Sequence, residues 1–159
     1  MNTLCKKNIG IKIRVSLLTL ILILPGLLFG FKEISTKRLN NVAISGYDTV
    51  AYFTENKAIK GSPVFMVEWI GAEWRFSSQS NMHLFEDSPE KYAPAFGGYC
   101  SLGISNGKLF ACDAESYVIV KGKLYVLKNK KVRDIWLTDP EGYIVKAQEF
   151  WKRMTGEIE

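Results

Sequence analysis

Histidine is almost missing from this sequence of 159 residues, because His83 is its only one. Imidazole is the commonest general base and a frequent metal ligand, so a site built from several histidines is excluded. The sequence also contains no serine or cysteine motif with a base beside it, no phosphate-binding glycine loop and no pair of acids at a motif spacing. With these groups missing, we expect that the protein is not an enzyme.

Charged residues are missing from residues 15–31, which read VSLLTLILILPGLLFGF. The residues before this run carry four positive charges and no negative one: Lys6, Lys7, Lys12 and Arg14. A basic flank followed by an apolar run is typical of an export signal. The run is slightly shorter than the ~20 residues of a spanning helix, and Leu28 and Gly30 match a cleavage site poorly. Residues 1–31 are therefore predicted to be either a signal peptide or an N-terminal membrane anchor.

The part that follows this run has almost no net charge. Four of the 21 Lys and Arg residues precede the run, which leaves 17 against 16 Asp and Glu residues. A nucleic-acid-binding surface needs a basic patch, so we expect no nucleic-acid partner. We expect an exported protein, either periplasmic or anchored to the outer face of the cytoplasmic membrane. Its expected partners are the membrane, through residues 15–31 if these are not cleaved, and an envelope protein.

The exported part is the size of one small domain. Residues 32–41 are polar and predict a tether, and residues 42–154 predict the domain. Residues 63–76 and 117–127 each read as a β-hairpin, around Gly71 and Gly122. Amphipathic segments follow both hairpins, so the pattern predicts an α+β fold.

The helical segments have recognisable starts and apolar faces. Ser80 is predicted to cap the helix after the first hairpin, and Pro89 is predicted to open a second short helical turn. The last helices are predicted to bury one apolar face. The residues expected on it are Ile135, Trp136, Tyr143, Ala147, Phe150 and Trp151.

The two hairpin regions also resemble each other. A shift of 51 residues places Gly71 on Gly122, Pro89 on Pro140 and Tyr92 on Tyr143. We therefore predict two hairpin-plus-helix units, at about residues 64–96 and 115–152, packed into one domain about a pseudo-twofold axis.

Several strings resemble the YHS domain family, in particular its longer exported, periplasmic members. They are GYDTVAYF at residues 46–53, FEDSPEKYAPAFGGYC at residues 85–100 and the ending GKLYVL with DPEGYIVKAQEFW. The motif residues are Gly46, Tyr47, Asp48, Pro89, Tyr92, Gly97, Gly98, Tyr99 and Cys100. Asp48 is predicted to be a turn or cap residue before a strand.

The resemblance implies a binding role, but it carries over only in part. Shorter YHS domains of metal-handling proteins bind soft metals through paired cysteines near the first hairpin. This sequence has Ser77 and Ser78 near that place. Cys100 matches the cysteine of the longer exported members, whereas Cys112 matches no motif of the family.

Cysteine is scarce, since only Cys100 and Cys112 follow the apolar run, and three interpretations of them stay open. With Met82 and His83 they form a candidate soft-metal site for copper or zinc. In an oxidising compartment they can instead form a disulfide. They can also be separate side chains, with Cys100 buried. Two function classes follow: an exported YHS-type binding module that handles a soft metal ion or an apolar ligand, or a structural or protein-interaction domain without a ligand.

Overall fold

The structure is a computed structural model that describes residues 33–36 and 41–156. The predicted signal peptide or anchor, with the apolar run at residues 15–31, lies outside the described residues, and so does half of the predicted tether. None of the helices in the described part of the chain combines the length and the apolar character that crossing a membrane requires.

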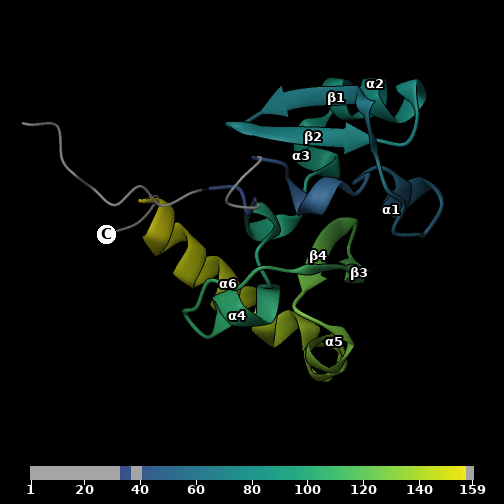
Figure 1. Cartoon of the computed structure of the whole chain (residues 1–159). Coiled ribbons are helices and arrows are strands. Elements are labelled where there is room, and N and C mark those ends of the chain that lie inside the picture. The colour runs from purple at the N-terminus through teal and green to yellow at the C-terminus, as the bar shows by residue number, and fades with distance from the viewer. Residues whose placement is uncertain (1–32, 37–40, 157–159) are drawn as a thin grey trace, which may run out of the picture. The chain divides into compact units, whose positions relative to one another are not determined.

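The described chain forms two consecutive units with the same order of elements (Figure 1). The first unit, residues 42–93, contains η1 (Ile44–Gly46), α1 (Ala51–Thr54), β1 (Ser62–Trp69), β2 (Ala72–Phe76), α2 (Gln79–Asp87) and α3 (Pro89–Tyr92). The second unit, residues 94–155, contains η2 (Ala95–Gly98), α4 (Ser101–Ser105), β3 (Asp113–Val120), β4 (Lys123–Leu127), α5 (Lys130–Trp136) and α6 (Pro140–Thr155). The predicted α+β fold with two hairpin-plus-helix units is confirmed.

The two hairpins have the same strand register, and both contain a bulge at the matching place. In the first, Ser62 pairs with Phe76 and Met66 with Arg75, so the longer strand carries extra residues between the two pairs. In the second, Asp113 pairs with Leu127 and Tyr117 with Val126, which is the same irregularity 51 residues later. A bulge bends the strand and increases its twist, so both hairpins wrap over their helices in the same way.

The helix that follows each hairpin begins at a polar cap. Ser78 accepts a hydrogen bond from the backbone N–H of Asn81, and Asn129 accepts one from that of Val132. Each cap satisfies an N–H group that has no partner within its helix. The prediction of Ser80 as the cap is wrong, because β2 ends at Phe76 and Ser80 already lies inside the first turn of α2.

Each unit buries a matching set of apolar side chains. Phe76 and Phe85 are fully buried in the first unit, and Leu127 and Trp136, 51 residues later, are fully buried in the second. Burying one such side chain contributes about 1.5–3 kcal/mol, so these positions stabilise each unit in the same place. A third cluster, Tyr52 with Leu124 and Val126, joins the two units, and the Tyr52 hydroxyl donates to the Ala114 carbonyl at 2.8 Å.

The predicted apolar face of the last helices is correct except at one position. Trp136 and Ala147 are buried, and Tyr143, Phe150 and Trp151 are partly buried. Ile135 is 43% exposed. Adjacent residues of a helix point in directions about 100° apart. Trp136 faces the core, so its neighbour Ile135 faces solvent.

The similarity of the units extends to the segments before the hairpins. Residues 44–46 have φ angles of 46°, 54° and 79°, and residues 96–98 have φ angles of 54°, 58° and 79°. The triplet Gly46-Tyr47-Asp48 therefore matches the triplet Gly98-Tyr99-Cys100, which lies 52 residues later. A short helix follows each triplet, α1 in the first unit and α4 in the second. The predicted pseudo-twofold axis remains a prediction.

Residues 33–36, within the predicted tether, pack against the domain. Ile34 is only 4% exposed, and the backbone N–H of Ser35 donates to the Gly97 carbonyl at 2.8 Å. Burial of the apolar Ile34 side chain stabilises this contact, because it removes apolar surface from water. The domain core therefore begins at Ile34, earlier than the predicted residue 42.

Candidate functional site

The first unit contains a buried carboxylate, Asp48, that is surrounded by donors. Its Oδ1 accepts from the backbone N–H groups of Val50 at 2.9 Å and Ala51 at 3.2 Å. Its Oδ2 accepts from the Ser77 backbone N–H at 2.8 Å, the Ser77 hydroxyl at 2.6 Å and the Asn81 amide at 2.7 Å. A carboxylate has about four lone-pair positions, so these five donors occupy all of them.

Asp48 is therefore a structural cap of α1 and not a ligand for anything outside the chain. The prediction of a cap residue is confirmed, but the element that it precedes is the helix α1 and not a strand. The charged carboxylate is fully buried, and its donors offset a desolvation cost of several kcal/mol.

Cys100 occupies the place of Asp48 in the second unit. The backbone N–H of Asp48 donates to the Ile59 carbonyl at 2.8 Å, and that of Cys100 donates to the Phe110 carbonyl at 2.9 Å. Two further positions correspond at a shift of 51: Lys128 replaces Ser77, and Val132 replaces Asn81. The carboxylate and the two side chains that bind it in the first unit are thus all absent from the second.

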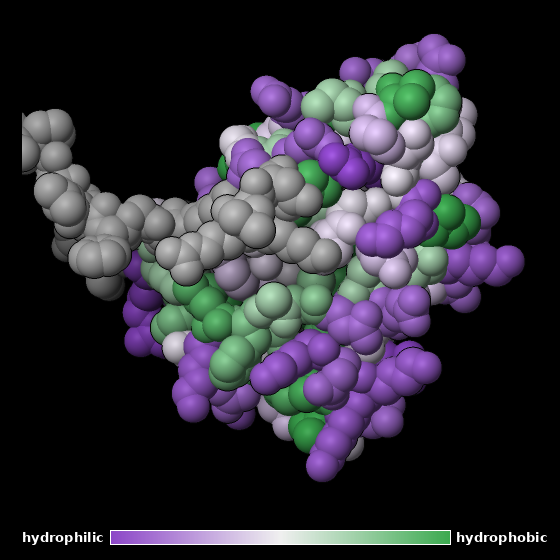
Figure 2. All heavy atoms as spheres, viewed as in Figure 1, coloured by the Kyte–Doolittle hydropathy of each residue, from purple (hydrophilic) through white to green (hydrophobic). Residues whose placement is uncertain are grey.

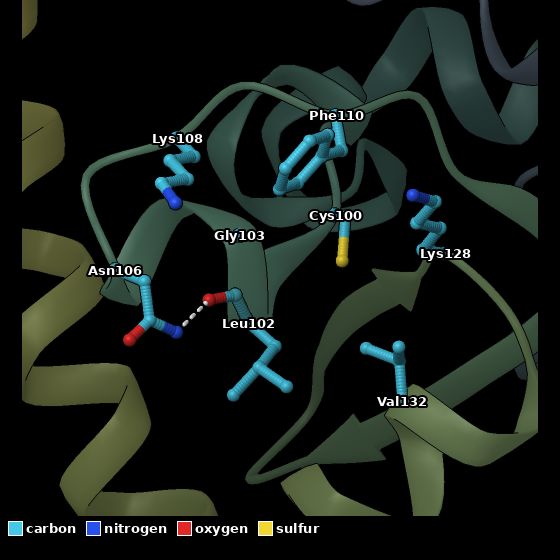
Figure 3. A pocket seen from close by; sticks show the side chains of 8 residues that line it. All are labelled: Cys100, Leu102, Gly103, Asn106, Lys108, Phe110, Lys128 and Val132. Atoms are coloured by element: carbon cyan, nitrogen blue, oxygen red, sulfur yellow. Dashed lines mark hydrogen bonds between the residues drawn. The ribbon is translucent and has the colours of Figure 1, made fainter.

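A cavity of about 310 Å³ lies at this place in the second unit. Its lining consists of Cys100, Leu102, Gly103, Asn106, Lys108, Phe110, Lys128 and Val132 (Figure 3). The Cys100 sulfur points into the space between Leu102 and Val132, and the two lysines stand on opposite sides of it in this view (Figure 3). Cys100 itself is only 1% exposed, so its thiol lies at the deep end of the cavity.

The charge of the lining is positive. Lys108 and Lys128 are its only charged members, and it contains no carboxylate. The Lys128 ammonium lies 4.7 Å from the centre of the Phe110 ring, a cation–π contact that holds it at the edge of the cavity. The Asn106 amide donates to the Leu102 carbonyl at 2.7 Å. The cavity therefore joins an apolar interior to a cationic opening. Figure 2 shows hydrophilic and hydrophobic residues close together over much of the visible face.

The four residues predicted to bind a metal ion do not form a common site. Cys100 belongs to the core of the second unit and Met82 packs against that of the first, while Cys112 packs against the core of the first unit and the cluster that joins the two. His83 is exposed on α2. Across residues 33–36 and 41–156, no three His, Cys, Asp or Glu side chains converge as a metal site requires.

Both cysteines are free thiols in the structure. Burial raises the pKa of the Cys112 thiol from 9.0 to about 12, and the nearby Cys100 adds to this effect. A thiol with a raised pKa stays protonated at neutral pH, and a protonated thiol is a poor nucleophile and a poor metal ligand. Of the three interpretations of the cysteines, the structure corresponds to separate side chains, with Cys100 buried and Cys112 partly exposed.

The other motif residues shape the backbone around the site. Pro89 begins α3, and Tyr92 packs edge-on against Phe53 with ring centres 5.5 Å apart. Tyr99 packs near Trp151 of α6 at 6.3 Å. Positive φ angles at Gly46, Gly97 and Gly98 form the tight turns before α1 and α4. These turns place Asp48 and Cys100 at the starts of those helices.

The sequence prediction included Cys100 but missed the rest of the cavity. Lys108, Phe110, Lys128 and Val132 belong to no motif, and a search for motifs could not find them. The repeat contained a usable signal, because GYD and GYC match at a spacing of 52 residues whereas the hairpins match at 51. The second unit has one residue fewer between the triplet and the hairpin, so an ungapped comparison missed the match.

Comparison with known families confirms the resemblance for the first unit. The YHS domain family model matches residues 50–96, so this segment is similar to a YHS domain. The match ends four residues before Cys100, and the cavity lies beyond it. No curated protein and no solved structure matches the chain.

Proposed function

We propose that this protein is an exported, non-enzymatic binding module of the YHS type, and that it binds a small molecule in the cavity beside Cys100. The cavity itself carries this proposal. Its volume of about 310 Å³ lies at the lower end of the range of ~300–1,000 Å³ typical of small-molecule sites. Its mostly apolar lining with a few polar groups at the opening is also typical of such sites.

The lining supports binding and not catalysis. Cys100 is its only thiol or hydroxyl nucleophile, and neither histidine nor a carboxylate stands beside it in the lining to take a proton. Export is supported by the basic flank and the apolar run at residues 15–31. An envelope protein that delivers or receives the ligand is the partner this role requires, and nucleic acid is not, since the exported part is nearly neutral.

The residues present do not fit a soft metal ion, the ligand of the shorter YHS domains. Residues 50–96 contain no cysteine, and the lone pairs of Asp48 next to them are already used. In the second unit the cavity lining offers a single thiol, and its two ammonium groups repel a metal cation. A small organic ligand suits this lining better.

The reactivity of Cys100 tests the proposal without knowledge of the ligand. In a Cys112→Ser background, methyl methanethiosulfonate should label Cys100 of the folded protein, because the cavity lets a small reagent reach a buried sulfur. A fragment library of mixed charge is then screened for compounds that protect Cys100 from labelling and raise the melting temperature.

A variant with a filled cavity provides the control. Val132→Phe should fill the cavity and abolish both labelling and protection, and Leu102→Phe serves as a second filling variant. Val145→Phe is the matched control, because Val145 is 63% exposed on α6 and does not line the cavity. If no fragment protects Cys100, the cavity is not a binding site and the structural domain without a ligand is the better interpretation.

A further inference from the structure

The two units differ at two matched positions in a way that indicates what the ligand supplies. In the first unit Ser77 donates its hydroxyl and its N–H to a carboxylate, and the chain provides that carboxylate as Asp48. In the second unit Lys128 stands at the position of Ser77, and Cys100 stands at that of Asp48. The second unit therefore keeps a group that can bind a carboxylate, the Lys128 ammonium, but the chain no longer provides the carboxylate.

Lysine at this position also changes the depth at which an anion can bind. The Lys128 ammonium lies over the Phe110 ring at the edge of the cavity, and Lys108 stands on the opposite side in Figure 3. Across the described part of the chain, neither lysine forms an ion pair, whereas the surface residue Lys121 is paired with Glu141 at 2.6 Å. Two unpaired cations around one opening attract an anionic group to the opening and not to the bottom.

The interior below the opening is apolar. Leu102, Phe110 and Val132 form its walls, and the Cys100 sulfur lies at its deep end (Figure 3). Water in such a space has few hydrogen-bond partners, so an alkyl or aromatic group gains free energy by replacing it. The cationic opening and the apolar interior together select a ligand that has both an anionic end and an apolar end.

We infer that the ligand is a small amphipathic anion, namely a carboxylate with a short apolar chain. Its carboxylate binds between Lys108 and Lys128, and its chain lies against Leu102, Val132 and the sulfur of Cys100. This inference rests on the proposed function, because it names the ligand class of the same cavity. It goes further by assigning the selectivity to two lysines that no motif marks.

The test compares hexanoate, hexanol and hexylamine, which share one alkyl chain and differ in the charge of the head group. Affinity is measured by calorimetry and by protection of Cys100 from methyl methanethiosulfonate in the Cys112→Ser protein. Hexanoate should bind most tightly, and added salt should weaken hexanoate but not hexanol, because salt screens the attraction to exposed lysines.

Charge-removing variants assign the effect to the two lysines. Lys108→Gln and Lys128→Gln should each lower the affinity for hexanoate by about two- to fivefold, the size of an exposed ion pair, and leave hexanol unchanged. Lys131→Gln is the matched control, because Lys131 is an exposed lysine of α5 outside the cavity.

Each outcome is decisive. Equal or tighter binding of hexanol or hexylamine, or unchanged hexanoate binding in the double variant, overturns the ligand class and leaves the cavity as a binding site. Failure of all three compounds, and of the fragment library, overturns both the ligand class and the proposed function.

Discussion

Asp48 and Cys100 occupy one structural position in two copies of a single unit. Both follow a Gly-Tyr pair, both precede a short helix, and both donate their backbone N–H to a carbonyl of the chain before the hairpin, at 2.8 and 2.9 Å. Their side chains have opposite surroundings, since five donors enclose the carboxylate and a cavity faces the thiol. The same backbone thus supports a closed polar cluster in one unit and an open site in the other.

Asp48→Asn should destabilise the domain strongly. The new amide group would direct its own N–H atoms toward donors and leave at least one buried donor without an acceptor, which costs about 1–3 kcal/mol per group. We expect a loss of about 3 kcal/mol in the free energy of unfolding, measured by urea denaturation. Asp87→Asn, at an exposed position of α2, is the control and should change little. Equal stability of the two variants would contradict the assignment of Asp48 as a buried cap.

Gly97→Ala should prevent stable folding, whereas Gly71→Ala should be tolerated. Both glycines have positive φ angles, +58° and +63°, so alanine is strained at either position by about 1–2 kcal/mol. A Cβ at Gly97 would also lie 1.7 Å from the Glu33 carbonyl oxygen, while a Cβ at Gly71 would meet nothing within 4 Å. Thermal denaturation should separate the two, and similar melting temperatures would show that residues 33–36 do not pack against Gly97.

Cys112 should make the domain less stable in alkali. The pKa of its thiol is 9.0 in the unfolded chain and about 12 in the folded one, so between these values only the unfolded state has lost the proton. The contribution of the protonated Cys112 thiol to the free energy of unfolding is therefore complete below pH 9.0. It is lost as the pH rises toward about 12. Urea midpoints should fall less from neutral pH to about 10.5 in Cys112→Ser than in the unchanged protein. Burial, the main cause, also raises the pKa of Tyr52 in both proteins.

The four side chains predicted from the sequence to bind metal should behave unequally when they are replaced. Cys100→Ser places a hydroxyl in a buried site and should cost about 1–3 kcal/mol. His83→Ala should be nearly silent, because His83 is exposed. Metal analysis of protein purified without a histidine tag should find no stoichiometric copper or zinc. A bound ion that is lost in His83→Ala would restore the metal site and contradict the assignment of these residues to separate places in the fold.

The proposed export predicts a topology for the whole chain. A reporter that is active only in the periplasm, fused after Glu159, should be active, because the basic flank stays inside and the rest crosses. Replacing Leu20 and Leu22 in the apolar run with arginine should abolish the signal, since charges stop insertion of such a run. A silent reporter on the unchanged chain would show that the protein remains in the cytoplasm.

The hairpins and helices could be predicted because their signals are local. Gly71 and Gly122 mark turns that require a positive φ. The apolar residues around Trp74 recur with the periodicity of a strand, and those around Trp136 recur with that of a helix. The short helix α1 could not be predicted, since it has only one turn and is stabilised by the side chain of Asp48 and not by its own propensity. The burial of Ile34, in the segment predicted as a tether, could not be predicted for a similar reason, because it depends on packing against the core of the first unit.

The candidate site could be predicted only at its centre. Cys100 lies in a recognisable string, but Lys108 and Lys128 are ordinary surface residues in the sequence, and only the path of the chain after β4 brings Lys128 beside Phe110. A cavity is the space that the surrounding side chains leave empty when they pack. That property depends on three-dimensional packing, and no spacing in one sequence encodes it.

The third core cluster, in which Tyr52 of the first unit packs with Leu124 and Val126 of the second, determines what would happen if the chain were divided. Neither half could cover these side chains alone, so each fragment would be soluble only together with the other. Cleavage at Ala93–Pro94, between the units, should give two peptides that assemble into one domain. The cavity would then form only in the assembled domain, because α4 and β4 would become ordered only when residues 42–93 bind. A split pair of this kind would couple ligand binding to fragment association and provide a direct readout of both.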